Sequence, residues 1–182
     1  PGKKQCNFDC LYCELDAAKT MDTYDDVVSV KEVVNALKMA LKQHNDIDFI
    51  TLTANGEPTL YPYLSTLIDE INTFKGTTKT LILSNAANID DVKVQNALLK
   101  LDEVKLSLDC ATQKCLQKLD RSHKGIDIEN IKAGMLEFKS KYNGPLIIEI
   151  LIVKTLNDSE EEIAKLNAYL LKLKPTRIDI GT

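Results

Sequence analysis

The chain has 182 residues, of which 44% are hydrophobic, and this size and composition suit one folded domain and exclude a disordered segment. A formal net charge of -4 argues against a general binder of nucleic-acid backbones. With no apolar run near the roughly 20 residues of a membrane span, and no apolar N-terminal stretch of the secretory kind, we expect a cytoplasmic protein. We expect residues 1–182 to form one domain trimmed from a longer chain, because no initiator methionine precedes Pro1.

Helices and strands alternate along the sequence. Apolar stripes at helical spacing predict helices, and short β-prone runs predict strands between them. Ser29 to Glu32 and Ser159 to Glu162 have the form of capping boxes that open the first and last helices. The expected helices cover residues 30–41, 64–71, 94–101, 128–138 and 163–173, and the expected strands cover residues 47–53, 80–84, 104–109, 146–153 and 177–180.

This alternation predicts an α/β fold with parallel strands. Strands joined through helices pair in parallel by right-handed crossovers, and about 30 residues per unit is typical of a (β/α) barrel. A doubly wound open sheet is the structural alternative. No repeat, low-complexity tract or Gly/Ser linker divides the chain, which favours one domain.

Charged residues occupy alternate positions of the last three strands. Lys105 shares one strand face with other polar residues, Glu149 interrupts an apolar strand, and Arg177 and Asp179 alternate with isoleucines. The pattern suits a barrel interior that holds a polar ligand, and we take as a hypothesis that Lys105, Glu149 and Arg177 contact substrate. Positions at the rim or edge of the sheet would explain it equally well.

The stretch CNFDCLYC places Cys6, Cys10 and Cys13 within eight residues. Five cysteines, an odd number with three crowded together, make a poor disulfide framework and favour a metal site with free thiols. Structural zinc takes four ligands in two short-spaced pairs. The expected second pair of ligands is supplied neither by the two histidines nor by Cys110 and Cys115. An iron–sulfur cube held by three cysteines instead leaves one iron open for an external ligand. A zinc site remains the alternative.

The CxxxCxxC spacing, with Tyr12 as the aromatic residue before the last cysteine, resembles the radical S-adenosylmethionine (SAM) superfamily. The resemblance implies a [4Fe-4S] cluster on Cys6, Cys10 and Cys13, whose open iron binds SAM. Reductive cleavage of SAM would then give a 5'-deoxyadenosyl radical that abstracts hydrogen from a substrate. It also implies an open, partial (β/α)6 TIM-like barrel whose first strand, before the cysteine loop, is missing from this sequence.

Residues that follow three of the expected strands resemble the SAM contacts of this superfamily. In ANGEPT, Gly56 would let the backbone approach the methionine moiety and Glu57 would receive its ammonium group, although Asn55 stands where many members have glycine. Ser84 and Asn85 resemble positions near the carboxylate, and Ser107 and Asp109 resemble those that hold the ribose. Each of these residues alone is equally well explained as a turn or helix cap.

Longer segments are similar to a narrower group within the superfamily. NGEPTLYP, KLSLD and EILIVKTLNDSEEEI resemble iron–sulfur oxidoreductases related to the wyosine-forming enzymes that modify tRNA. The resemblance implies an electron donor such as flavodoxin or ferredoxin, and a substrate that is a small molecule, an RNA or a protein. A glycyl-radical-enzyme activase and a non-catalytic zinc or iron–sulfur scaffold remain alternatives. Cys110 and Cys115 are interpreted as structural or incidental.

Overall fold

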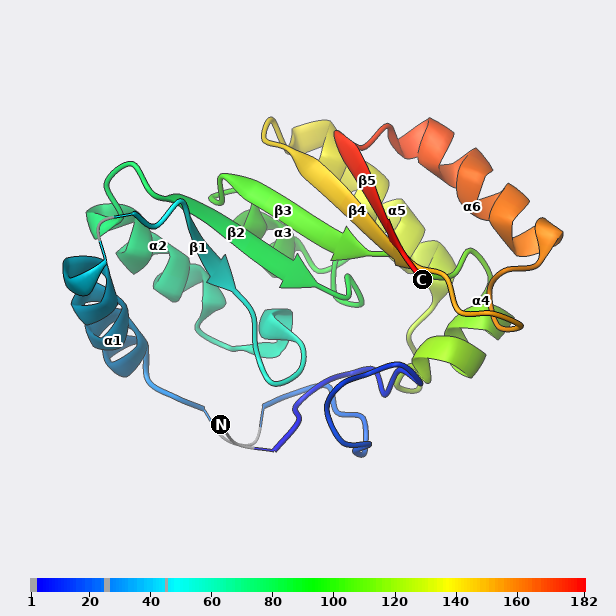
Figure 1. Ribbon diagram of the computed structural model, residues 1–182, viewed down its shortest axis with the longest axis horizontal. Coiled ribbons are helices and arrows are strands. Elements are labelled where there is room, and N and C mark those ends of the chain that lie inside the picture. The colour runs from blue at the N-terminus through cyan, green and yellow to red at the C-terminus, as the bar shows by residue number, and fades with distance from the viewer. Residues whose placement is uncertain (1–2, 25–26, 45) are drawn as a thin grey trace.

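The architecture is an open parallel sheet covered by helices. The computed structural model describes residues 3–24, 27–44 and 46–182 (Figure 1). Five parallel strands lie in chain order, so the predicted alternation and the open α/β barrel-like class are confirmed, and the expected earlier strand lies outside the described residues. The strands are β1 (Phe49–Leu52), β2 (Lys79–Ser84), β3 (Glu103–Ser107), β4 (Leu146–Leu151) and β5 (Arg177–Gly181).

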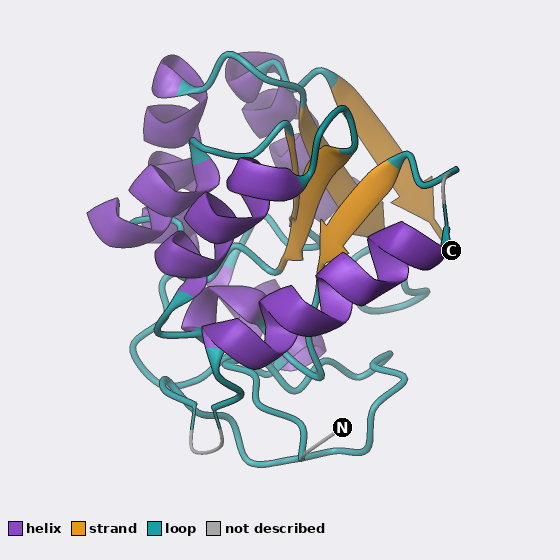
Figure 2. Ribbon diagram, turned by 90° about the vertical axis from the view of Figure 1, so that its left-hand side faces the viewer, coloured by secondary structure: helices purple, strands orange, loops and turns teal. Residues whose placement is uncertain are grey.

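Each predicted helix is present, and three short helical turns were not predicted. The long helices are α1 (Val30–Gln43), α2 (Leu64–Phe74), α3 (Val92–Leu98), α5 (Ile128–Lys141) and α6 (Glu160–Leu173), and Figure 2 shows most helices gathered on one side of the sheet. The short turns are η1 (Pro58–Leu60), α4 (Gln113–Cys115) and the π-helical η2 (Leu116–Asp120). None of the helices in the described part of the chain combines the length and apolar character needed to cross a bilayer.

Only one of the two predicted capping boxes is complete. The Ser29 hydroxyl accepts the Glu32 N–H, and the Glu32 carboxylate accepts the Ser29 N–H in return. At α6 the Ser159 hydroxyl accepts the Glu162 N–H at 3.3 Å, but the Glu162 carboxylate turns away to accept the Thr112 N–H and hydroxyl, each at 2.9 Å. The second capping box therefore lacks the predicted hydrogen bond from the Ser159 N–H to the Glu162 carboxylate, because Thr112, distant in sequence, binds that carboxylate instead.

The two faces of the sheet differ as strand parity predicts. Val104, Leu106 and Ile148 are fully buried and pack with α5 residues such as Phe138 in the main core. This apolar contact between sheet and helices removes the largest side chains from water and supplies the main favourable term in folding.

The opposite face carries a network of charges across β3, β4 and β5. Lys105 Nζ lies 3.1 Å from Glu149 Oε1 and 2.9 Å from Asp179 Oδ2, and Arg177 Nε lies 2.7 Å from Asp179 Oδ1. Strand register pairs Glu149 with Asp179, which places both carboxylates on one face. The prediction of a polar face is confirmed, and these four charges neutralise one another on it.

The outer edge of β1 borders a groove of about 590 Å³. Its walls include Val33 and Leu37 of α1 and Leu64 and Leu67 of α2, and no strand of the described residues pairs with β1 along this edge. An additional strand of the kind expected from the family resemblance would have its place here.

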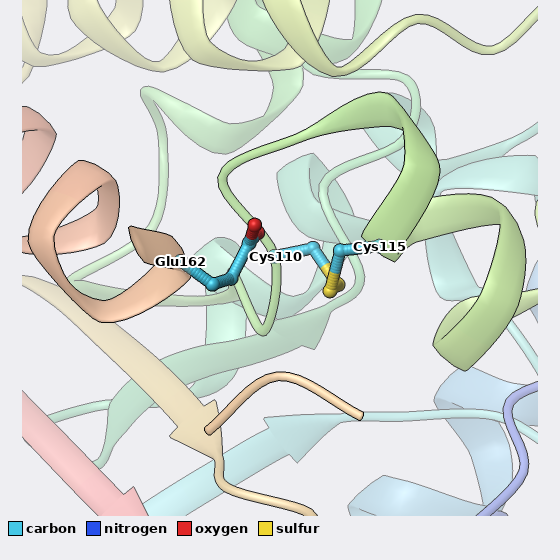
Figure 3. A group of neighbouring side chains, drawn as sticks. All are labelled: Cys110, Cys115 and Glu162. Atoms are coloured by element: carbon cyan, nitrogen blue, oxygen red, sulfur yellow. A yellow bond between two sulfur atoms is a disulfide. The ribbon is translucent and has the colours of Figure 1, made fainter. Parts of the chain in front are cut away.

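Cys110 and Cys115 are joined by a disulfide, with their Cα atoms 5.5 Å apart (Figure 3). The expectation of free thiols is wrong for this buried pair, and the interpretation of the pair as structural or incidental stays an interpretation. The turn that Thr112 caps by accepting the Cys115 N–H brings the two cysteines together, and the Glu162 carboxylate lies beside them. The cysteines of the N-terminal loop are free, as predicted.

The core contact yields a stability prediction. Replacing Ile148, which is 0% exposed, with alanine should lower the free energy of unfolding by about 2–5 kcal/mol, because a cavity remains in the sheet–helix interface. The matched change Ile180→Ala, in the neighbouring strand at a side chain that is 67% exposed, should cost less than about 1 kcal/mol. Urea unfolding of the metal-free protein measures both, and equal losses would contradict the assigned core.

Candidate cofactor site at the strand ends

The cysteine loop lies across the carboxyl ends of the strands and is fastened to η2. Asp9 N–H donates to the Asp120 carbonyl at 3.0 Å, and Leu11 N–H donates to the Leu119 carbonyl at 2.9 Å. The π-helical segment thus uses carbonyls near its end to hold the loop in place, and such segments occur often at functional sites. Sequence periodicity did not reveal this docking segment.

The three thiols of the loop are free, half-buried and within electrostatic reach of one another. A charge on Cys13 would raise the pKa of Cys6, and a charge on Cys6 would raise that of Cys10. Cys6 Sγ also accepts the Phe8 N–H at 3.4 Å and a side-chain N–H of Asn85 at 3.5 Å. One loop therefore offers three soft sulfur ligands with hydrogen-bond donors already directed at a sulfur.

Burial makes the Cys6 and Cys10 thiols weak acids in the metal-free protein. It raises the pKa of Cys6 to about 11 and that of Cys10 further, where the nearby Asp120 charge adds to the effect. A metal centre that binds thiolates must therefore displace their protons, which couples its binding to pH. The donor set fits an iron–sulfur cluster, since thiolates are its usual ligands.

The turn after β1 requires glycine. Gly56 has φ +139°, and a Cβ built on it would lie 1.8 Å from the Gln5 carbonyl oxygen. Gln5 N–H donates to the Asn55 carbonyl at 2.8 Å, and the Glu57 N–H donates back to the Gln5 carbonyl at 2.9 Å. The turn thereby binds the backbone directly before Cys6, so ANGEPT is more than a simple chain reversal.

The Glu57 carboxylate is buried, 1% exposed, and accepts four hydrogen bonds. The donors are the Thr59 N–H at 2.9 Å, the Thr59 hydroxyl at 2.6 Å, the Ser84 hydroxyl at 2.7 Å and the Asn85 N–H at 2.8 Å. Burial raises the pKa of this carboxyl, and these donors oppose that rise. Glu57 joins the ends of β1 and β2, and its expected contact with an ammonium group stays a prediction.

An amide network links the loop to both strand ends. Asn7, 1% exposed, accepts an Asn85 side-chain N–H at 2.7 Å and donates to Asn88 Oδ1 at 3.3 Å, while Asn88 donates to Thr59 Oγ1 at 3.1 Å. The Asn7 carbonyl also accepts the His123 N–H at 2.8 Å. Sequence reasoning missed Asn7, because an asparagine between two cysteines carries no sign that it is buried.

Tyr12 and Asp109 meet across the site. The Tyr12 hydroxyl donates to Asp109 Oδ2, and the Leu151 N–H donates to Asp109 Oδ1 at 2.7 Å. Four of the predicted residues border one cavity of about 40 Å³: Tyr12, Asn85, Ser107 and Asp109. This space is far smaller than a nucleoside, and the expected contacts of these residues with SAM stay predictions.

Asp120, at the end of η2, borders the same cavity and was also missed. Burial and the nearby Asp109 charge raise the pKa of Asp120 to about 8, and the Cys10 side chain opposes that rise. A carboxyl group beside a thiol of the cysteine loop gives this end of the site a second ionisable group that strand-end reasoning did not reveal.

Comparison with known proteins identifies the family. The family model described as the radical SAM superfamily matches residues 3–166. The chain belongs to this superfamily. A radical SAM methyltransferase from Sphaerobacter thermophilus has a similar fold, with a TM-score of 0.66 and 14% identity over 97% of this chain and 52% of its own. The family prediction is thus confirmed, and the narrower resemblance to wyosine-related oxidoreductases stays a prediction.

Curated relatives of this radical SAM chain are longer proteins. A Helicobacter pylori protein named UPF0026 is 42% identical over all of this chain, which spans 59% of that relative's length. A Campylobacter jejuni GTP 3',8-cyclase is 31% identical over 86% of this chain and 47% of its own.

The thiol environment predicts slow alkylation of the metal-free protein. At pH 8 the ionised fraction of Cys6 should be about 100-fold smaller than in the unfolded chain, because its pKa lies at about 11 instead of 9.0. Site-resolved mass spectrometry after iodoacetamide treatment, repeated over a pH series, measures the rate. The rate should keep rising towards pH 11, and an inflection near pH 9 in the folded protein would contradict the assignment.

The Glu57 contacts predict a large effect of an isosteric change. In Glu57→Gln one acceptor oxygen becomes an N–H group that faces donors, so the free energy of unfolding should fall by about 1–3 kcal/mol. The exposed α2 residue Glu70 provides the control, and Glu70→Gln should change stability by less than about 0.5 kcal/mol. Chemical denaturation measures both variants, and a stable Glu57→Gln protein would show that the carboxylate contacts are dispensable.

Proposed function

We propose that this chain is the catalytic core of a radical SAM enzyme whose [4Fe-4S] cluster is held by Cys6, Cys10 and Cys13. The observation that carries the proposal is the set of three free, half-buried thiols in one loop, docked at the carboxyl ends of a parallel sheet. Cys6, Cys10 and Cys13 would hold the cluster, which would supply the one-electron chemistry needed to cleave SAM to a 5'-deoxyadenosyl radical for hydrogen abstraction from a substrate.

The disulfide favours iron over zinc. A structural zinc site needs four ligands, and Cys110 and Cys115, the remaining cysteines, are bonded to each other. Three thiolates, with the other two cysteines bonded to each other, suit a centre that must accept an external molecule, which is the requirement for chemistry at an open metal position.

The strand-end residues are proposed to hold SAM. Asp109 would accept hydrogen bonds from the ribose hydroxyls, together with Ser107. One of its carboxylate oxygens accepts the Leu151 N–H and the other accepts the Tyr12 hydroxyl, so the carboxylate has a fixed position. Gly56 keeps the turn close to the loop, and Glu57 orders Ser84 and Asn85 behind the methionine moiety. These residues bind and orient the cofactor, and the transferred electron comes from a donor such as flavodoxin or ferredoxin.

Substrate is proposed to approach the polar face of the sheet. Lys105 and Glu149 project from β3 and β4 on the side that the helices leave open, and they present charges of both signs. A polar substrate suits this face, and the similarity to a relative named GTP 3',8-cyclase is compatible with a polar, charged molecule. We propose a cytoplasmic location, where the three thiols of the loop would stay free to bind metal and the buried Cys110–Cys115 disulfide would be an exception.

Anaerobic reconstitution tests the proposal. The protein, supplied with iron and sulfide, should bind about four irons per chain, and reduced protein with SAM should form 5'-deoxyadenosine. Each single change Cys6→Ala, Cys10→Ala or Cys13→Ala should abolish both, because two thiolates cannot hold the cube. The double variant Cys110→Ser/Cys115→Ser is the control and should still load iron, because the Glu162 carboxylate holds the turn at Thr112 without the disulfide.

Stoichiometric zinc with no iron after anaerobic purification would favour a metal-binding scaffold. Iron loading without any 5'-deoxyadenosine, from a chain that includes its natural flanking sequence, would also refute the enzymatic function.

A further inference from the structure

Asn157 is a buried polar residue that none of the proposed cofactor contacts uses. It lies in the loop between β4 and α6 and is 0% exposed. Its amide nitrogen donates to the Asp109 carbonyl and to the Leu151 carbonyl, each at 2.8 Å, and its Oδ1 accepts the Val153 N–H at 2.7 Å. A buried amide bonded in this way holds its neighbours in one arrangement, because each lost bond would leave a buried polar group unpaired.

This amide joins the ends of β3 and β4 beyond their regular ladder, whose last register pair is Ser107 and Glu149. Side chains continue the pairing from there. The Leu151 N–H donates to the Asp109 carboxylate at 2.7 Å, and Asn157 binds the main-chain carbonyls of both residues. Asp109 is therefore held at its carboxylate and at its main chain by two different groups.

The loop around Asn157 follows a strained path. Thr155 has φ +69°, in the left-handed region that a β-branched residue rarely adopts. Asp158 Oδ1 accepts the Thr155 N–H at 2.8 Å on one side of the strained residue, and the Asn157 amide holds Val153 on the other. Strained backbone persists only where the surroundings over-determine it, and it gathers at sites that bind ligands or react. The loop therefore does more than connect β4 to α6.

The direction of the Asp109 carboxylate depends on its main chain. The aspartate side chain has only two rotatable bonds, so a rotation of the backbone turns the carboxylate with it. Each carboxylate oxygen already accepts one hydrogen bond, from Leu151 or Tyr12, and keeps a further lone pair for a ligand hydroxyl. A group that fixes the Asp109 carbonyl thus also fixes where these lone pairs are directed.

We propose that Asn157 is a positioning residue for SAM, which holds the Asp109 main chain so that the carboxylate is directed at the ribose hydroxyls. The inference rests on the proposed function, since it requires SAM at the strand ends with its ribose at Asp109. Loss of the Asn157 amide should weaken the ribose contact and leave cluster loading unchanged, because its bonds go to the ends of β3 and β4 and to the loop that follows.

The test compares the affinity of the reconstituted protein for SAM and for a SAM analogue whose ribose lacks both hydroxyls. The cluster is kept oxidised, so that neither molecule is cleaved, and anaerobic calorimetry gives the dissociation constants. The wild-type protein should bind SAM about tenfold more tightly than the analogue. In Asn157→Ala the dissociation constant for SAM should rise about tenfold and that for the analogue by less than about twofold, so that the preference disappears.

Gln95 provides the matched control. It is also an amide that is 0% exposed, and its nitrogen donates to the Ile89 carbonyl at 3.0 Å, but it lies in α3, a helix that contributes none of the proposed cofactor contacts. Gln95→Ala should destabilise the fold to a similar degree and keep the wild-type preference for SAM over the analogue. General destabilisation would affect both variants alike, whereas positioning of Asp109 is lost only with Asn157.

A second variant keeps the inference testable if Asn157→Ala does not fold. Asn157→Gln retains the amide but displaces it by one methylene, so its preference for SAM over the analogue should also fall. A wild-type preference in Asn157→Ala, or in Asn157→Gln where only that variant folds, would overturn the inference. An equal loss of preference in Gln95→Ala would overturn it as well.

The two proposals fail in different ways. A wild-type protein that binds no iron–sulfur cluster would refute the proposed function before Asn157 is tested. A cluster-loaded wild-type protein whose preference for SAM is unchanged by the loss of Asn157 would refute only the role assigned to this residue. Equal binding of SAM and the analogue by the cluster-loaded wild-type protein would also refute that role, since there would be no ribose contact to position.

Discussion

The site depends on how an irregular loop with few contacts of its own is held against the sheet. Backbone hydrogen bonds tie it at both sides, from Gln5 to the turn at Gly56 and from Asp9 and Leu11 to the carbonyls of η2. Backbone bonds of this kind fix the path of the chain whatever side chains the loop carries. The cysteines can therefore be arranged for ligation, since the loop itself needs none of them for its shape.

The second anchor depends in turn on distant parts of the chain. The disulfide and the Glu162 carboxylate hold the segment around Thr112 from two directions, so α6 supports the turn from which α4 and η2 start (Figure 3). A loop near the N-terminus is thereby braced by a helix near residue 162. The position of the cysteine loop therefore depends on contacts between distant parts of the chain and not on one sequence motif alone.

Sequence reasoning was most successful where a single periodicity governs the structure. Strand order, the long helices and the polar parity of Lys105 and Glu149 follow from hydrophobic spacing, which burial of one face enforces. The three-cysteine motif identified the family correctly. Its spacing gives no information about what surrounds the sulfurs, so the buried Asn7 and Asp120 were found only in three dimensions.

The errors have a common physical cause, which is competition between local and distant partners. Glu162 could complete a local cap, but two donors at Thr112 attract its carboxylate instead. The disulfide likewise forms because a capped turn folds Cys115 back onto Cys110. Gly56 is constrained by a single close contact, because the Gln5 carbonyl leaves no room for any larger residue. An added Cβ at Gly76 or Gly125, by contrast, meets no atom within 4 Å. Gly76 and Gly125 can therefore be replaced in evolution by residues that tolerate a left-handed backbone. Position 56 can change only if the backbone before the first cysteine takes another path.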